Sequence, residues 1–379
     1  MRVAINAWFW NQPTAGSGQY TRCLVEHLGA VAPELEILLV APDGWGFQVS
    51  GSERPETLNA GPDVGKLAKV WFEQITFPRA CRHLSADVAH VPYWAPPLFP
   101  SVPTVATIHD LIPMLLREYR GGPSVRMYTA LVGQAARSAA LVLTDSESSR
   151  RDIIAHLGLA AGHVRAVHLA AEARYSPDPD PDDAAIRARY DLPQRYMLYL
   201  GGFDVRKNLV MVIDAYRRAA ATIGEACSLV IAGQLPKEDT PFAPDPRRLV
   251  WEHALEEHLV HLPGFVAEED KPAVYRGAVA FVFPSRYEGF GLPPLEALAC
   301  GIPVVGSNVS SIPEVVSDGG LLLPPDDIEG MAEALVKLAT DAGFRAELSR
   351  RALAQAARFS CEKMAHETLA AYRDVTAQV

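Results

Sequence analysis

The sequence has no closely spaced cysteines, no long apolar run and no excess of positive charge, and each absence excludes a class of protein. Its five cysteines are scattered, without the close spacing of a zinc motif or a disulfide framework, which favours reduced, mostly buried thiols. No run of about 18 apolar residues is present to cross a bilayer, and the apolar start of the chain is too short for a signal peptide. We therefore expect a cytoplasmic protein with at most peripheral membrane contact.

The formal net charge of -10 argues against a nucleic-acid-binding protein, because a phosphate backbone requires a basic face. The composition is otherwise ordinary for a soluble protein, with 49% hydrophobic and 21% charged residues. A chain of 379 residues is long enough for two domains of about 150 to 200 residues, each with its own core.

Short apolar runs recur along the chain and alternate with longer helical stretches. This is the βαβ pattern of a parallel sheet that is covered on both faces. The expected strands are 3–7, 37–40, 88–91, 102–108, 141–144, 196–200, 228–232, 260–262, 278–283 and 304–307. Ligands of such sheets collect at the carboxyl ends of the strands. The expected fold class is α/β, with two Rossmann-like, doubly wound parallel-sheet domains.

The clearest boundary signal is S-P-D-P-D-P-D-D-A at 176–184, which is rich in proline and acidic residues and lacks large apolar side chains. We expect a linker at 176–192 between an N-terminal domain at 1–175 and a C-terminal domain at 193–360. Its alternating aspartates resemble a D-x-D metal motif. No apolar strand flanks them, however, so we predict no metal site there.

One stretch, F-V-F-P-S-R-Y-E-G-F-G-L-P-P-L-E at 281–296, combines a strand, a glycine loop and a helix that we expect to begin at Pro293 or Pro294. Four amides of the loop have no helical acceptor and lie at the positive end of the helix dipole, which makes an anion site. These amides belong to Gly289, Phe290, Gly291 and Leu292.

Two carboxylates bracket this loop, because Glu288 precedes the glycines and Glu296 lies one turn inside the helix. A diphosphate on the amides would place one sugar near each carboxylate, which accepts hydrogen bonds from neighbouring hydroxyls. A nucleotide sugar carries a sugar on each side of a diphosphate, so the stretch predicts a nucleotide-sugar site. Taken alone, it also fits a plain glycine turn with two ordinary carboxylates.

A second stretch, G-G-F-D-V-R-K-N-L at 201–209, follows an earlier strand. It places Arg206 and Lys207 at the carboxyl end of that strand, where two cations can hold a diphosphate and stabilise the charge of a departing one. Asn208 can cap the following helix. Solvated surface charge is the usual alternative for such a pair.

Together these motifs resemble the donor site of retaining glycosyltransferases with the GT-B fold, in the large family four that includes bacterial mannosyl- and glucosyltransferases. The matching segments are E-G-F-G-L-P-P-L-E, the G-G-x-x-x-x-R-K-N pattern and H-D-x-x-P at 109–113. The resemblance implies two domains that face a cleft, with the donor on the second and the acceptor on the first. It also implies a last helix, at 361–379, that returns to the first domain, and a reaction without metal or other cofactor.

The resemblance further implies roles for single residues. His109 would lie beside the transferred sugar, Glu288 would orient that sugar and Glu296 would hold the ribose. Arg206 and Lys207 would pair with the leaving diphosphate in a front-face reaction, since no carboxylate stands out as a covalent nucleophile. Further contacts to the nucleotide sugar are expected from Gly18, Gly202, Phe265, Val266 and the loop residues 289–292.

The expected donor is GDP-mannose, because H-D-L-I-P and the 201–209 stretch are similar to bacterial mannosyltransferases, although UDP-hexose enzymes share almost all of these residues. The expected acceptor is a glycan, a lipid-linked acceptor or a small molecule. One rival interpretation is a nucleotide-sugar hydrolase or epimerase, which consumes the donor alone. Another is an inactive subunit that only binds nucleotide sugar.

Residues 65–84 mix aromatic and basic side chains. The functional interpretation is a face that meets an anionic lipid surface or a lipid-linked acceptor. The alternative is an ordinary amphipathic helix with its apolar side in the core. The residues concerned are Trp71, Phe72, Ile75 and Phe77 with Lys66, Lys69, Arg79 and Arg82.

Overall fold

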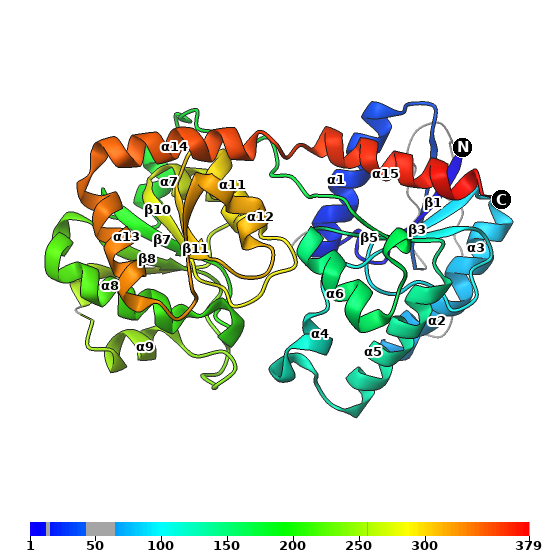
Figure 1. Ribbon diagram of the computed structural model, residues 1–379, viewed down its shortest axis with the longest axis horizontal. Coiled ribbons are helices and arrows are strands. Elements are labelled where there is room, and N and C mark those ends of the chain that lie inside the picture. Colours follow the sequence, from blue (N-terminus) through cyan, green and yellow to red (C-terminus); the bar gives the residue numbers. More distant parts are fainter. Residues whose placement is uncertain (13–15, 43–64, 256, 379) are drawn as a thin grey trace. The chain divides into compact units, whose positions relative to one another are not determined.

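The structure is a computed structural model that describes residues 1–12, 16–42, 65–255 and 257–378. The chain divides into two compact units (Figure 1). The first comprises Met1–Leu169 and Ser360–Val379, and the second comprises Ala170–Phe359. Each unit contains a parallel sheet with helices packed against it, which confirms the expected fold class.

The sheet of the first unit has six parallel strands in the order β2-β1-β3-β4-β5-β6. Every residue of β3, β4 and β5 is buried, as expected for strands that are covered on both faces. The strands are β1 (Arg2–Asn6), β2 (Glu36–Val40), β3 (Val88–Val91), β4 (Thr104–Thr107), β5 (Leu141–Thr144) and β6 (Val164–Ala166).

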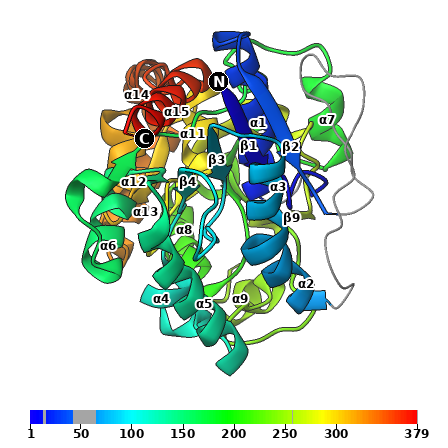
Figure 2. The ribbon, with the colours of Figure 1, turned by 90° about the vertical axis from the view of Figure 1, so that its right-hand side faces the viewer.

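Helices of the first unit come from both ends of the chain. They are α1 (Gly16–Val31), α2 (Gly65–Trp71), α3 (Phe77–His83), α4 (Ile112–Leu115), α5 (Pro123–Ala135), α6 (Glu147–Leu157) and α15 (Cys361–Thr376). The last helix, α15, packs against α1 (Figure 2). Its Tyr372 hydroxyl lies 2.7 Å from Nδ1 of the buried His90 in β3, so α15 is also joined to the sheet.

Residues 65–84 form α2, a π-helical turn (Phe72–Thr76) and α3. Phe72 and Phe77 are fully buried, and Nζ of Lys69 lies 4.8 Å from the centre of the Tyr93 ring and pairs with Glu73. These side chains therefore belong to the core, which favours the amphipathic-helix interpretation over a lipid-facing surface. Trp71, Arg79 and Arg82 are exposed, and the side chain of Lys66 lies outside the described ones.

The sheet of the second unit also has six parallel strands, in the order β12-β11-β10-β7-β8-β9. The strand order reverses between β7 and β10, and the carboxyl edge beside such a reversal is where open α/β sheets bind ligands. The strands are β7 (Tyr196–Leu200), β8 (Ser228–Ala232), β9 (Val260–Gly264), β10 (Ala278–Phe283), β11 (Val304–Ser307) and β12 (Gly320–Leu323).

The helices of the second unit connect and cover these strands. They are α7 (Asp183–Arg189), α8 (Leu209–Ile223), α9 (Pro246–Glu252), α10 (Lys271–Arg276), α11 (Leu292–Ala299), α12 (Ile312–Val316), α13 (Ile328–Thr340) and α14 (Ala342–Ala356). The helix α8 buries Val212, Ile213 and Tyr216 among others, which are the positions that its helical spacing predicts.

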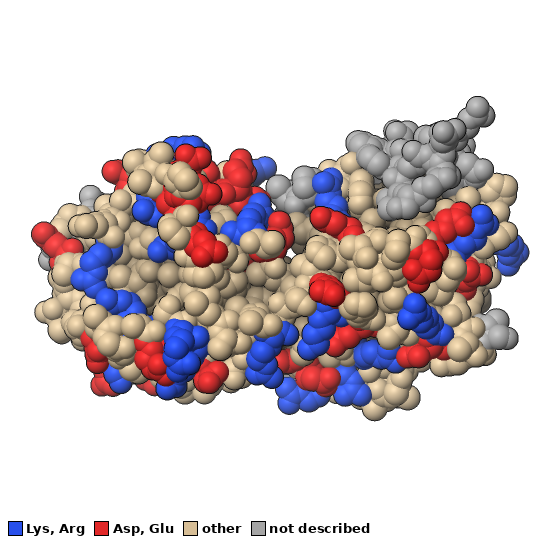
Figure 3. Space-filling model, turned by 90° about the horizontal axis from the view of Figure 1, so that it is seen from above, with Lys and Arg blue, Asp and Glu red and all other residues tan. Residues whose placement is uncertain are grey.

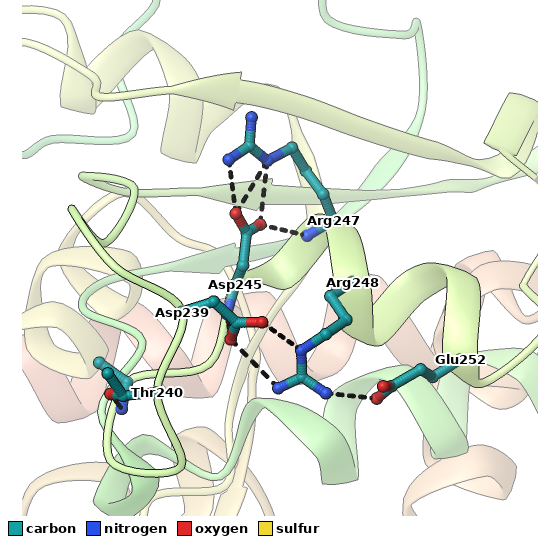
Figure 4. Close-up of polar contacts among 7 residues, drawn as sticks. Asp239, Thr240, Asp245, Arg247, Arg248 and Glu252 are labelled. Atoms are coloured by element: carbon teal, nitrogen blue, oxygen red, sulfur yellow. Dashed lines mark hydrogen bonds and ion pairs between the residues drawn. The ribbon is translucent and has the colours of Figure 1, made fainter.

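Ion pairs hold the long loop between β8 and α9 (Figure 4). Asp245 caps α9 by accepting a hydrogen bond from the amide of Arg247 at 2.8 Å, and Arg248 pairs with both Asp239 and Glu252. The carbonyl of Phe242 in the same loop accepts a hydrogen bond from the amide of Val205 at 2.8 Å. This loop therefore supports the turn that follows β7.

Charged residues of both signs are interspersed on the face that Figure 3 shows, with no broad basic field on it. Within the described part of the chain, no helix has both the length and the apolar character that a membrane crossing requires.

The prediction that 176–192 is a linker is wrong in its second part, because residues Asp183–Arg189 form the helix α7. Residues 177–182 are exposed, but Asp183 is buried and pairs with Arg276 of α10 through two contacts of 2.5 and 2.8 Å. This pair ties α7 to the second unit, which begins at Ala170 rather than at 193. The D-P repeat concealed α7 because the proline-rich part ends one residue before the helix starts.

We predict that Asp183→Ala lowers the free energy of unfolding by about 3 kcal/mol, because it leaves the guanidinium of Arg276 without its carboxylate in a mostly buried position. Urea unfolding followed by circular dichroism measures the change. The exposed Asp178→Ala serves as the control and is expected to change stability by less than about 0.5 kcal/mol. Equal stability of Asp183→Ala and wild type would show that α7 is not held by this pair.

Candidate active site

The two motifs of the second unit meet at the edge where its strand order reverses. β7 leads into a short 3-10 turn (Val205–Lys207), and the neighbouring strand β10 leads into the glycine loop. The strands pair directly, with Leu198 opposite Phe281. Beyond them the amide of Arg286 donates a hydrogen bond to the carbonyl of Arg206 at 2.8 Å. The two segments are therefore joined through their backbones.

The side chains of Arg206, Lys207 and Glu288 form one cluster. Nη1 of Arg206 lies 2.6 Å from Oε2 of Glu288, and Nζ of Lys207 lies 2.8 Å from Oε1. The three side chains are only 11%, 13% and 12% exposed. The structure thus brings together three of the four predicted catalytic residues, from two loops that are 81 residues apart.

The cluster has two cations and one carboxylate, so positive charge is in excess. Burial would raise the pKa of Glu288, but Lys207 and Arg206 outweigh that effect and hold the pKa below its usual range. The carboxylate is therefore ionised at neutral pH. Asp204 lies 3.5 Å from Nε of Arg206, and Nζ of Lys207 also lies 4.9 Å from the centre of the Phe283 ring. An arriving anion would thus compete with Glu288 for the two cations.

The glycine loop is held by two serines from the segment after β11. The amide of Glu288 donates to Oγ of Ser310 at 2.9 Å, and Oγ of Ser311 donates to the carbonyls of Glu288 and Phe290 at 3.0 and 2.5 Å. The sequence pattern alone assigns no role to these serines. They fix the loop conformation from outside the central motif.

The helix α11 begins at Leu292, one residue before the expected start, with Pro293 in its first turn. Gly291 precedes it with a φ of 119°, and a Cβ at that position would lie 3.1 Å from Cδ1 of Ile312. Glycine is therefore required there. Gly289 lies in the same loop, whereas the Phe290 side chain is buried against Phe359, so only its backbone can face a ligand.

Glu296 lies in the second turn of α11 and accepts a hydrogen bond from the Tyr275 hydroxyl at 3.0 Å. Burial raises the pKa of Glu296, and Lys271 is the main charge that opposes the increase. Its position on the helix agrees with the predicted spacing from Glu288. Its closest partners are on α10 rather than in the cluster of Arg206, Lys207 and Glu288.

The other residues predicted to contact the nucleotide sugar differ in whether the side chain or only the backbone is accessible. Gly202 follows β7, and its carbonyl accepts a hydrogen bond from Tyr199 at 2.5 Å. Phe265 is 54% exposed after β9, but the side chain of Val266 is buried, so Val266 can contact a base only through its backbone. Gly18 lies in the first unit, where a Cβ would come within 2.3 Å of the Gln12 carbonyl oxygen, so close packing alone explains this glycine.

Asn208 does not cap α8 in the predicted way. It precedes the helix in a left-handed conformation (φ 57°), and its side chain makes no capping hydrogen bond. Its amide instead donates to the carbonyls of Pro284 and Pro325, at 3.2 and 2.9 Å. Asn208 therefore ties the turn after β7 to the loop after β10, which sequence spacing could not reveal.

His109 of the first unit follows β4, and it is paired with Asp145, which follows the neighbouring strand β5. Nδ1 of His109 lies 2.8 Å from Oδ2 of Asp145, and the Tyr20 ring meets the imidazole edge to face at 5.0 Å. Burial lowers the pKa of His109, but Asp145, helped by Asp110 and the Pro92 carbonyl, opposes burial and the pKa is raised overall. Spacing along the chain does not pair Asp145 with His109, because only the pairing of β4 with β5 in the sheet brings the two strand ends together.

Family models match almost the whole chain. Residues 14–172 match the model described as Glycosyltransferase Family 4, and residues 182–359 match the model described as Glycosyl transferases group 1. A relative from Escherichia coli, O-antigen chain mannosyltransferase B, is 32% identical over 95% of this chain and 96% of its own length. The serotype-specific mannosyltransferase WbdA of the same organism is also 32% identical, over 69% of this chain and 32% of WbdA.

Solved structures show the same fold. Sucrose-phosphate synthase from Thermosynechococcus elongatus aligns with a TM-score of 0.76 at 22% identity and covers 100% of both chains. WaaG, a glycosyltransferase involved in lipopolysaccharide biosynthesis, aligns with a TM-score of 0.70 at 16% identity over 97% of this chain and 98% of WaaG. Fold and motifs define a glycosyltransferase of the GT-B type. The chain belongs to glycosyltransferase family 4, and its second half carries the group 1 domain.

We predict that Asp145→Asn lowers the pKa of His109, because the variant removes the main negative charge that opposes the effect of burial. A raised folded-state pKa adds stability below the unfolded pKa of about 6.5, and this stability is lost as the pH rises through the folded pKa. The variant should therefore lose stability mainly at acidic pH. Histidine NMR titration and urea unfolding at several pH values measure both effects.

The surface variant Asp374→Asn, whose aspartate pairs with Arg165, is the control and should leave the His109 titration unchanged. The His109→Gln variant identifies the NMR signal of His109, because that signal is missing from its spectrum. An unchanged His109 pKa in Asp145→Asn would contradict the electrostatic role given to Asp145.

Proposed function

We propose that the protein is a retaining, metal-independent hexosyltransferase that moves mannose from GDP-mannose to a glycan, lipid-linked or small-molecule acceptor. The observation that carries the proposal is the cluster of Arg206, Lys207 and Glu288 at the edge where the strand order of the second unit reverses. The mannosyltransferase names of the E. coli relatives support the choice of sugar.

In this proposal the donor diphosphate lies between the amides of residues 289–292 and the two cations. Arginine and lysine bind phosphate oxygens strongly, and the start of α11 adds a positive dipole. Because the cations already pair with Glu288, the diphosphate would take over part of their charge. The Glu288 oxygens then become available to accept hydrogen bonds from the sugar hydroxyls.

Transfer then proceeds on one face of the sugar. The bond from the anomeric carbon to the phosphate oxygen breaks, and the acceptor oxygen forms its bond on the same face. The departing phosphate takes the acceptor proton, while Arg206 and Lys207 stabilise its negative charge. Two fixed cations supply the charge that a bound metal would otherwise provide, which supports a metal-independent reaction.

The remaining predicted residues are assigned to the other parts of the donor, or to the acceptor. Glu296 holds the ribose, Phe265 and the backbone of Val266 contact the base, and Gly202 approaches the donor through its backbone. We assign His109 to the transferred sugar, since its ring is held by Asp145 and is 24% exposed. Gly18 is proposed as a contact for donor phosphate or acceptor.

A UDP-hexose donor is the second candidate. A solved structure of HepE from Anabaena in complex with UDP-glucose aligns with this chain at a TM-score of 0.70 and 17% identity. The groups that we assign to the diphosphate and the sugar do not distinguish one base from another. The exposed Phe265 and its neighbours after β9 would therefore decide the choice of base.

We predict that Lys207→Ala and Glu288→Ala each lower mannose transfer by at least about 100-fold, because each removes a charge that the transition state needs. The assay uses GDP-mannose, an acceptor panel and EDTA, with donor alone as a control against hydrolysis or epimerisation. Arg218→Ala, on α8, removes an exposed ion pair with Glu329 of α13 and should retain wild-type activity. Turnover near wild type in either site variant would contradict the assigned roles.

Tight nucleotide binding without transfer to any acceptor would instead indicate a nucleotide-sugar-binding subunit. Release of free sugar or an epimer from the donor alone, at a rate comparable with transfer, would indicate the hydrolase or epimerase.

We predict that GDP raises the melting temperature more than UDP, ADP or TDP at equal concentration, because stabilisation follows affinity for the folded state. Thermal-shift measurements on wild type and Lys207→Ala test this, and the variant should lose most of the shift. A larger shift with UDP would replace GDP-mannose by a UDP-hexose and leave the site assignment intact.

A further inference from the structure

Two cysteines that are 338 residues apart in the sequence lie side by side in the first unit. Cys23 is on α1, Cys361 is the first residue of α15, and their Sγ atoms are 3.1 Å apart. Nδ1 of His27 lies 3.8 Å from Sγ of Cys23. The three ligand atoms lie within 4.8 Å of one another, so a single ion can reach all of them after small side-chain movements.

The three residues of this cluster come from two helices, α1 and α15. Cys23 and His27 are four residues apart on α1, which puts both side chains on the same face of the helix. α15 packs against α1, and the hydroxyl of its capping residue Ser360 accepts a hydrogen bond from the amide of Lys363 at 3.1 Å. This cap fixes where α15 starts and therefore where Cys361 points.

We propose that Cys23, His27 and Cys361 form a binding site for a thiophilic metal ion, with Zn²⁺ as the ion of choice. Two thiolates and an imidazole are ligands that Zn²⁺ prefers, and three protein ligands leave a fourth position for water.

The two sulfur atoms need to move little to bind one ion. With Zn–S bonds of about 2.3 Å, two bound thiolates stand roughly 3.8 Å apart, so the sulfurs would separate by less than about 1 Å. Nδ1 of His27 lies 2.8 Å from the carbonyl oxygen of Cys23, and on binding the imidazole would carry its proton on Nε2 instead. The two thiols would release two protons, and the bound ion and two thiolates would have no net charge.

A disulfide is the competing use of the same sulfurs. It would join Cys23 to Cys361 but would leave His27 without a role, whereas a metal ion uses all three side chains. The proposed ion would fasten the last helix to α1 within the first unit. None of its three ligands is a residue that we assign to the transfer reaction, so we expect the ion to add stability to the first unit without acting in transfer.

The test uses the full chain, reduced and stripped of metal with a chelator, and titrated with Zn²⁺ against a chromophoric competitor. We expect one Zn²⁺ per chain and a melting temperature that rises when Zn²⁺ is added. Co²⁺ as the probe should give the intense sulfur-to-cobalt charge-transfer absorption of a thiolate site.

Cys23→Ser and Cys361→Ser should each weaken Zn²⁺ binding by at least about 100-fold and abolish the charge-transfer band, and His27→Ala should weaken binding by about 10-fold or more. His366→Ala, an exposed histidine on the same helix α15, is the matched control and should bind like wild type. Circular dichroism confirms that each variant is folded.

Three outcomes would overturn the proposal. The first is no stoichiometric binding by the reduced protein, and the second is binding that survives both cysteine variants. The third is a Cys23–Cys361 disulfide in the protein as purified, with no metal affinity after reduction. Each of these is independent of the transfer activity, which is assayed in parallel.

Discussion

The arrangement of the candidate site depends on the position of one carboxylate. Glu288 lies between the guanidinium of Arg206 and the ammonium of Lys207, and all three side chains are largely shielded from water. Removing one member of such a group would leave an uncompensated charge, so the turn after β7 and the loop after β10 must keep their relative position. The same charges are the ones that a nucleotide sugar requires. The same three residues therefore hold the two segments together and supply the charges of the proposed reaction.

Several contacts that bear no catalytic group hold this arrangement. Asn208 donates to backbone carbonyls beyond β10 and after β12, while Ser310 and Ser311 bind the backbone of the glycine loop. The ion-paired loop before α9 supports Val205. Rigid support of this kind matters because transfer gains from charges that are already oriented toward the departing phosphate. In the first unit, Asp145 orients His109 in the same manner.

Much of the fold and the centre of the site could be predicted from the sequence. The apolar runs at 196–200, 228–232 and 278–283 coincide with β7, β8 and β10, because buried parallel strands need unbroken apolar residues. β6 and β12 were missed. The three residues of β6 include Arg165 and make no such run, and the four residues of β12 begin with a glycine and are followed directly by two prolines, which is typical of a loop. Asp145, Asn208 and the pair Cys23 and Cys361 could not be assigned from spacing, because only the tertiary fold brings their partners near. Local sequence patterns therefore located the motifs. The residues that support the motifs could be identified only from the tertiary contacts.

The central claim is that a pyrophosphate binds to Arg206, Lys207 and the backbone amides of residues 289–292. A crystal structure of the full chain with GDP tests it most directly. The account predicts that both phosphates contact this group, that the ribose lies at Glu296 and that the base lies near Phe265. Phosphate density at any other place in the second unit, with Glu288 still paired to both cations, would contradict it.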